Sequence, residues 1–136
     1  MISYEPFKKL TKTDIKVLSI LWSAPEPLTA SQMASEDPSF SINTVQATIR
    51  KLLSNNYIEV SNIVYSGTVL ARTYKPTLLQ KDFALAKLTY EYHRIENALS
   101  IADFITALLQ SESDSDRLRQ DIKEIRQLLE QYESHL

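Results

Sequence analysis

The chain has 136 residues and a net charge of −2, and its 43% hydrophobic and 24% charged residues are typical of one small globular protein or of a small domain with an appendage. Its single glycine and its lack of cysteine exclude glycine-rich phosphate loops, dinucleotide-binding turns, disulfides, thiolate metal sites and cysteine nucleophiles. No apolar run approaches the roughly 18 residues that cross a bilayer, and residues 1–10 lack the apolar core of a signal peptide, so we expect a cytoplasmic protein.

The first predicted helix spans residues 12–23. Thr11 and Thr13 are both suitable N-caps, and Asp14 places a negative charge in the first turn. The apolar positions recur at helical spacing and are Ile15, Leu18, Leu21 and Trp22. Because Trp22 continues this stripe, we interpret it as a core residue without a functional role.

Two more helices follow. A short one is expected from a cap at Thr29 or Ser31 to about residue 34. The next begins at Ser41 and closes at Asn55-Asn56. Its apolar residues fall within about 100° of each other on a helical wheel and are Ile42, Val45, Ile49, Leu52 and Leu53.

The period of the sequence changes after these helices. Residues 58–75 alternate and are rich in β-branched side chains, which predicts a β-hairpin. Gly67 supplies the turn, and Pro76 ends the second strand. Three helices followed by a hairpin is the order of a winged helix-turn-helix.

Helical patterns fill the rest of the chain. Thr77 with Gln80 forms a capping-box pattern that opens a helix to about residue 93. A second helix is expected over roughly 97–110, and the polar run 111–116 opens a last one. Within one chain these short helices have little apolar surface against which to pack. We therefore expect their apolar stripes to pack against a second copy in a homodimer. The predicted dimer contacts are Phe83, Ile101, Phe104, Ile105, Leu108, Leu118, Ile122, Ile125 and Leu129.

The third helix carries, opposite its apolar stripe, a face suited to a DNA major groove. Asn and Gln side chains pair with adenine edges, Thr and Ala contact thymine methyls, and Arg and Lys reach guanine or phosphate. Every amphipathic surface helix has a solvent-exposed polar face, so this face alone does not indicate DNA binding. The hairpin that directly follows the third helix favours the DNA interpretation. The predicted DNA-contacting residues are Ser41, Asn43, Thr44, Gln46, Ala47, Arg50 and Lys51 on the helix, with Tyr65 and Arg72 in the hairpin.

The charge distribution agrees with an anionic partner for the first half. Residues 1–80 carry eight Lys and Arg against six acidic residues, whereas residues 81–136 carry seven against eleven. Between Ser41 and Lys75, four basic residues accompany a single acid, Glu59. We expect Arg72 to contact a DNA phosphate; the alternative is that it pairs with Glu59 across the hairpin.

These patterns predict a mainly α protein with a small β-hairpin. A winged-helix DNA-binding domain over residues 1–76 is followed by a helical dimerisation region over residues 77–136. His93 and Glu96 have the spacing of two metal ligands on a helix, but a zinc site needs three or four. No nucleophile has a matching base and acid, so we predict a protein that is not an enzyme and that uses no metal or cofactor.

Three segments resemble the family of the penicillinase repressors and the methicillin-resistance repressors. Residues 10–22 resemble the first helix of that family, with a hydroxyl residue, an acid three positions on and a final Leu-Trp. Residues 41–52 resemble its recognition helix, and residues 72–76 its second wing strand. The resemblance covers nearly the whole chain, including the helical tail.

The resemblance implies a dimeric winged-helix repressor that binds an inverted-repeat DNA operator and blocks transcription of a resistance or stress operon. In that family the inducing signal comes through a membrane sensor-protease pathway, or from copper bound by C-terminal cysteines, which this chain lacks. Proteolysis in the β-lactam repressors falls at an Asn-Phe bond that corresponds here to Asp103-Phe104, but Phe104 also continues the apolar stripe of its helix, and we interpret it as a core residue of the dimer interface in preference to a cleavage site. Asn43 and Gln46 stand where those repressors often carry basic residues, so the operator sequence does not carry over.

Two other functions fit the same fold. A winged helix can serve as a protein-interaction module, and a regulator can be gated by a small ligand in a cavity under the long helix from residue 77, near Tyr90 and Tyr92. The polar, small and basic face of the third helix favours DNA, because protein interfaces favour aromatic anchors.

Overall fold

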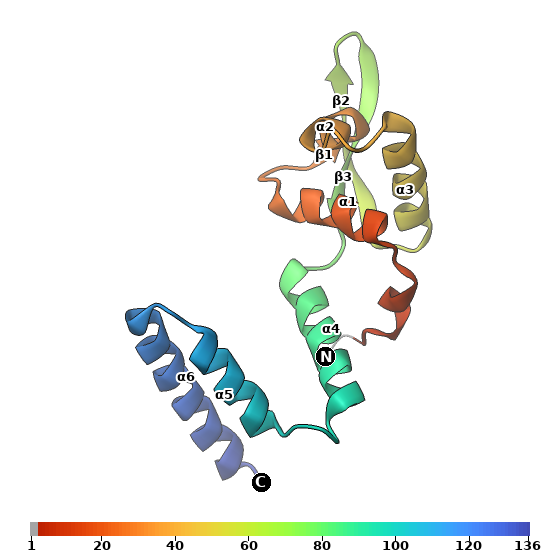
Figure 1. Cartoon of the computed structure of the whole chain (residues 1–136). Coiled ribbons are helices and arrows are strands. Elements are labelled where there is room, and N and C mark those ends of the chain that lie inside the picture. The colour runs from red at the N-terminus through yellow and green to blue at the C-terminus, as the bar shows by residue number, and fades with distance from the viewer. Residues whose placement is uncertain (1–2) are drawn as a thin grey trace. The chain divides into compact units, whose positions relative to one another are not determined.

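The computed structural model describes residues 3–136 (Figure 1). Its packing divides the chain into two compact units, the first ending at Tyr90 and the second formed by Glu91–Leu136. The elements of the first unit are a 3-10 helix η1 (Glu5–Lys9), α1 (Lys12–Ser23), β1 (Leu28–Thr29), α2 (Ala30–Glu36), α3 (Ile42–Ser54), β2 (Ile58–Ser66), β3 (Val69–Pro76) and most of α4 (Gln80–Ile95). The second unit contains the end of α4, α5 (Ile101–Ser111) and α6 (Ser115–Ser134).

Side-chain caps set the starts of the first three helices. The Thr11 hydroxyl accepts from the Asp14 N–H, at 3.1 Å, while the Asp14 carboxylate accepts from the Thr11 N–H, at 2.9 Å. Thr29 forms the same capping box at α2, and Ser41 caps α3 through the Thr44 N–H. The predicted helices are therefore confirmed, with Thr11 and Thr29 chosen from the alternative caps.

The three strands form one antiparallel sheet in the order β1-β3-β2. Tyr65 lies opposite Leu70, next to the turn, and Gly67 has a φ of 70°, which favours glycine. The predicted hairpin is confirmed. The sequence prediction missed β1, because two residues are too few to show an alternating pattern, and it also missed η1.

The core of the winged helix lies where α1, α2, α3 and the base of the sheet meet. The apolar stripes predicted for α1 and α3 supply most of it, because each helix turns one face inward. The buried core residues are Val17, Leu18, Leu21, Met33, Val45, Ile49, Leu52 and Ile58. This core leaves the opposite face of α3 at the surface.

An aromatic cluster joins the start of the chain to α4 within the first unit. Phe83 is 6% exposed, and its ring centroid lies 5.2 Å from that of Phe7 and 5.5 Å from that of Trp22. The Trp22 indole N–H donates to the Leu78 carbonyl, at 3.0 Å, which agrees with a packing role for Trp22. The members of the aromatic cluster are Tyr4, Phe7, Trp22, Tyr57, Phe83 and Tyr90. Phe83, predicted as a dimer contact, is thus covered by its own chain.

The structure corrects two predicted helix starts. The predicted helix from residue 77 begins at Gln80, because the Thr77 hydroxyl donates to the Asn56 carbonyl, at 2.7 Å, and does not cap the helix. The helix predicted from about residue 97 begins at Ile101, where Ser100 forms a capping box with Asp103. The division after residue 76 concerns which part binds DNA and which dimerises, and it stays a prediction.

The second unit has no buried residue in α5 or α6. The two helices run antiparallel (Figure 1), and a hollow of about 360 Å³ lies between them. Residues such as Ile105 and Ile125 are only half-buried there, and Ile101 is 62% exposed. Among residues 3–136, no helix is both long and apolar enough to span a membrane.

Candidate nucleic-acid interface

The exposed side of α3 presents the predicted base-contacting residues together. Val45, Thr48, Ile49 and Leu52 are buried on the opposite side of the helix. We call the exposed side the recognition face; its members are Ser41, Asn43, Thr44, Gln46, Ala47 and Arg50, and all six are exposed. Buried and exposed residues alternate with the helical period, so α3 is held by one face and leaves the other open to a partner.

Hydroxyl groups in the first turns of α3 make hydrogen bonds within the helix itself. Ser41 Oγ accepts from the Thr44 N–H, at 3.1 Å, and lies 3.0 Å from Thr44 Oγ1. Thr48 points inward and donates its hydroxyl to the Thr44 carbonyl, at 2.8 Å. The side chains whose hydrogen-bonding groups remain for a base edge are therefore chiefly Asn43 and Gln46.

The two adjacent cations of α3 differ in their surroundings. The Lys51 ammonium hydrogen-bonds and ion-pairs with the Asp14 carboxylate at the start of α1. The Asp14 side chain is 4% exposed and that of Lys51 is 40% exposed. Within residues 3–136, no such partner holds the guanidinium of Arg50, which is exposed. Only one of the two cations is thus already engaged.

Asp14 is held in its ionised form. Burial opposes its ionisation, but the Lys51 ammonium and the hydrogen bonds with Thr11 outweigh that effect and hold the pKa of this carboxyl below its usual range. A charged Asp14 therefore contacts the last turns of α3 through Lys51, whereas the sequence pattern indicated only an acid in the first turn of α1.

The β2–β3 hairpin, which we call the wing, has one ion pair at its base and one further cation midway along it. Glu59 lies opposite Lys75 and forms an ion pair with it, at 3.5 Å, whereas Arg72 lies opposite Ile63. The alternative that Arg72 pairs with Glu59 is therefore wrong. In the described chain, Arg72 has no ion pair and is exposed, so its side chain remains available to an anion.

The outer part of the wing carries no charge and exposes several large apolar side chains. No charged residue occurs in the sequence between Glu59 and Arg72. Cross-strand pairing puts Ile63, Tyr65 and Leu70 on one face, and Tyr65 is 75% exposed. The hairpin extends beyond the three helices (Figure 1), so both of its faces meet solvent there. The sequence prediction did not anticipate this surface, because an alternating strand pattern normally indicates one buried face.

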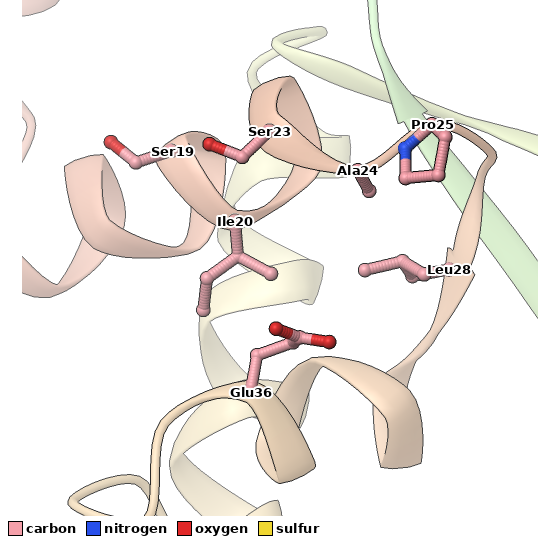
Figure 2. A pocket seen from close by; sticks show the side chains of 7 residues that line it. All are labelled: Ser19, Ile20, Ser23, Ala24, Pro25, Leu28 and Glu36. Carbon is pink, nitrogen blue, oxygen red and sulfur yellow. The ribbon is translucent and has the colours of Figure 1, made fainter.

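Two hollows lie elsewhere on the first unit. One, of about 390 Å³, is lined by residues of α1, β1 and α2 (Figure 2), in which Ile20, Leu28 and Glu36 point toward one another. The other, of about 430 Å³, lies beside Trp22 and the start of α4. Tyr90, suggested for a ligand cavity, instead packs against Tyr4 with ring centroids 5.1 Å apart.

The second unit contains two candidate sites from the sequence, the His93/Glu96 metal-ligand pair and the Asp103-Phe104 bond. His93 Nδ1 lies 3.0 Å from Glu96 Oε2, and residues 3–136 contain no group of three side chains arranged for a metal ion. The Asp103-Phe104 bond lies in the first turn of α5, where the hydrogen bonds from Ser100 lower the pKa of Asp103. Phe104 packs near Tyr92, with ring centroids 6.3 Å apart.

No protein-family model matches the chain, and no curated protein matches it. Solved structures of similar shape include three bacterial proteins. A MepR variant from a multidrug-resistant S. aureus clinical isolate is 18% identical, with a TM-score of 0.47, over 95% of this chain and 83% of that one. FabT from Streptococcus pneumoniae, solved in complex with DNA, is 19% identical, with a TM-score of 0.46, over 93% and 80%.

The third is PerR from Streptococcus pyogenes, whose structure explains peroxide sensing and gene regulation by that protein. It is 17% identical, with a TM-score of 0.41, and the match covers 53% of this chain and only half the length of that chain. Three helices, the third open on one face, and a β-hairpin in a three-stranded sheet define a winged helix-turn-helix.

Proposed function

We propose that this chain is a sequence-specific DNA-binding transcriptional regulator that acts as a homodimer at an inverted-repeat operator. The recognition face of α3 is the observation that carries the proposal. It joins two amide side chains, small residues that permit close approach and one unpaired cation, and all of them are exposed on a helix whose other side is buried.

The proposed contacts divide by their chemistry. Asn43 and Gln46 read base edges, Thr44 and Ala47 contact thymine methyls, and Ser41, with Arg50, Tyr65 and Arg72, contacts the sugar-phosphate backbone. The backbone contacts supply affinity and salt dependence, and the base contacts supply selectivity.

The second unit supports the dimer. Helices α5 and α6 carry apolar stripes, bury no residue and leave Ile101, Leu108 and Leu129 exposed. Pairing with a second copy removes this apolar area from water and sets two recognition faces on one duplex. By resemblance, we propose that the chain represses a resistance or stress operon; the sensor-protease pathway of the resembling family is one route of induction, and Asp103-Phe104 is the corresponding bond.

Selection of bound sequences from random duplex DNA tests the proposal. We expect an inverted repeat, since a two-fold symmetric dimer presents two equivalent recognition faces. Replacing Asn43 or Gln46 by Ala should cost about 1–3 kcal/mol on the selected operator and little on random DNA. Equal losses on both DNAs would show that these side chains do not read bases, and no enrichment would refute the proposed function.

One observation favours a second candidate function, that of a protein-interaction module. Ile63, Tyr65 and Leu70 form an exposed apolar patch on the wing beside Arg72, and aromatic and aliphatic anchors are typical of protein interfaces. In that case Tyr65→Ala would abolish binding of a protein partner, and the random-DNA selection would give no motif.

A further inference from the structure

We propose that Asp14 withholds Lys51 from DNA, so that Lys51 positions α3 on α1 and Arg50 is the only phosphate-binding cation of the recognition helix. The inference rests on the proposed function and replaces the sequence prediction that both cations touch DNA. It starts from the unequal surroundings of two neighbours in the chain.

Arg50 and Lys51 point in different directions. Successive residues of an α-helix are rotated by about 100°, so the two side chains leave α3 from different sides. Arg50 lies on the recognition face and is exposed, whereas Lys51 lies toward α1 and its ammonium meets the Asp14 carboxylate. The same carboxylate accepts the Thr11 N–H that begins α1, at 2.9 Å.

Burial makes the pairing unequal for the two partners. Asp14 has a side chain 4% exposed, so removal of Lys51 leaves a carboxylate that water cannot solvate well. Lys51 is 40% exposed, and its ammonium could be hydrated without Asp14. Asp14 therefore opposes any movement of Lys51 toward a phosphate, and the pair connects the first turn of α1 with the last turns of α3.

The electrostatic consequence is specific to DNA binding. A cation whose charge is already neutralised by a protein carboxylate releases few counterions when a phosphate approaches, so it adds little to the salt dependence of affinity. An unpaired guanidinium contributes fully. Removal of Arg50 and removal of Lys51 should thus change the salt dependence of DNA affinity by different amounts.

The test compares three full-length variants, Arg50→Met, Lys51→Met and Asp14→Asn, on duplex DNA of mixed random sequence. The affinity is measured at several salt concentrations and plotted as log affinity against log salt. Arg50→Met should flatten the slope by about one unit per chain, whereas Lys51→Met should leave the slope of the wild type and lower the thermal midpoint. A flattening by Lys51→Met equal to that of Arg50→Met overturns the inference.

Asp14→Asn tests the role of the carboxylate. An asparagine oxygen can still accept the Thr11 N–H, so the helix start is kept while the charge is lost. We expect a steeper slope, by about one unit per chain, and tighter binding to random DNA, because Lys51 is released. An unchanged slope in a folded Asp14→Asn protein, checked by circular dichroism, contradicts the inference. A wild-type chain without salt-dependent DNA binding overturns the proposed function as well.

Discussion

At the scale of single residues, tertiary partners decide which polar side chains are available to a ligand. Lys51 and Asp14 are 37 positions apart, and no local pattern in the sequence links them. Local signals did reveal Thr11, Thr29 and Ser41 as helix caps, because capping depends on neighbours within three residues. The exposed residues of the recognition face were predictable for the same reason, since a helical period fixes them once the apolar stripe is known.

The buried Asp14 predicts an acid-sensitive contribution to stability. Its folded-state pKa lies below the unfolded value of about 3.9, so its contribution is present above that pH and is lost as the pH falls through the folded pKa. The free energy of unfolding of wild type should therefore exceed that of Asp14→Asn at neutral pH, and the difference should shrink in acid. Trp22, the only tryptophan, reports unfolding of the first unit by its fluorescence. A difference that is constant from neutral to acid pH would contradict this assignment.

Arg72 predicts a separable contribution from the wing. Because it is exposed and Glu59 pairs with Lys75 instead, Arg72→Ala should flatten the salt slope of operator binding by about two units per dimer and leave the preferred sequence unchanged. Arg119→Ala, in α6, is the matched control and should keep the slope. A normal slope for Arg72→Ala would remove the wing from the phosphate contacts.

At the scale of elements, the aromatic cluster packs the first part of α4 onto the rest of the first unit. A helix pattern shows that α4 has an apolar stripe, but it cannot show what covers the stripe. The sequence pattern predicts Phe83 as a dimer contact, whereas in the structure η1 and Trp22 cover it. The first part of α4 consequently belongs to the winged-helix unit, which ends at Tyr90.

Phe83→Ala should destabilise the first unit by about 3–5 kcal/mol, because a large buried side chain is replaced by a cavity among Phe7, Trp22 and Tyr4. The matched control is Leu85→Ala on the same helix, where Leu85 is 45% exposed and its loss should cost far less. Urea unfolding followed by Trp22 fluorescence measures both. Equal costs at the two positions would show that the cluster does not stabilise the unit.

At the scale of the whole molecule, the two units contrast in how they are stabilised. The first has a contiguous core. Most of that core comes from the apolar stripes that the sequence predicts for α1 and α3. The second has no buried residue in α5 or α6, and the sequence pattern does not show what its stripes contact, because an apolar stripe can pack on another part of the chain or on a second copy. The exposed stripes are therefore the observation on which the proposed homodimer rests.

The dimer prediction can be tested with two positions on opposite sides of α5. Ile101 is 62% exposed and lies on the apolar stripe, whereas Gln110 is exposed and lies about 180° away around the helix. Ile101→Glu should shift the protein toward monomer in sedimentation equilibrium, since a charge in an apolar interface loses its hydration, while Gln110→Glu should stay dimeric. The Ile101→Glu monomer should also bind operator DNA far more weakly, because a dimer engages its second half-site as an intramolecular event. If both variants sediment as dimers and bind equally, the interface lies elsewhere, and the exposed stripes of α5 and α6 serve another partner.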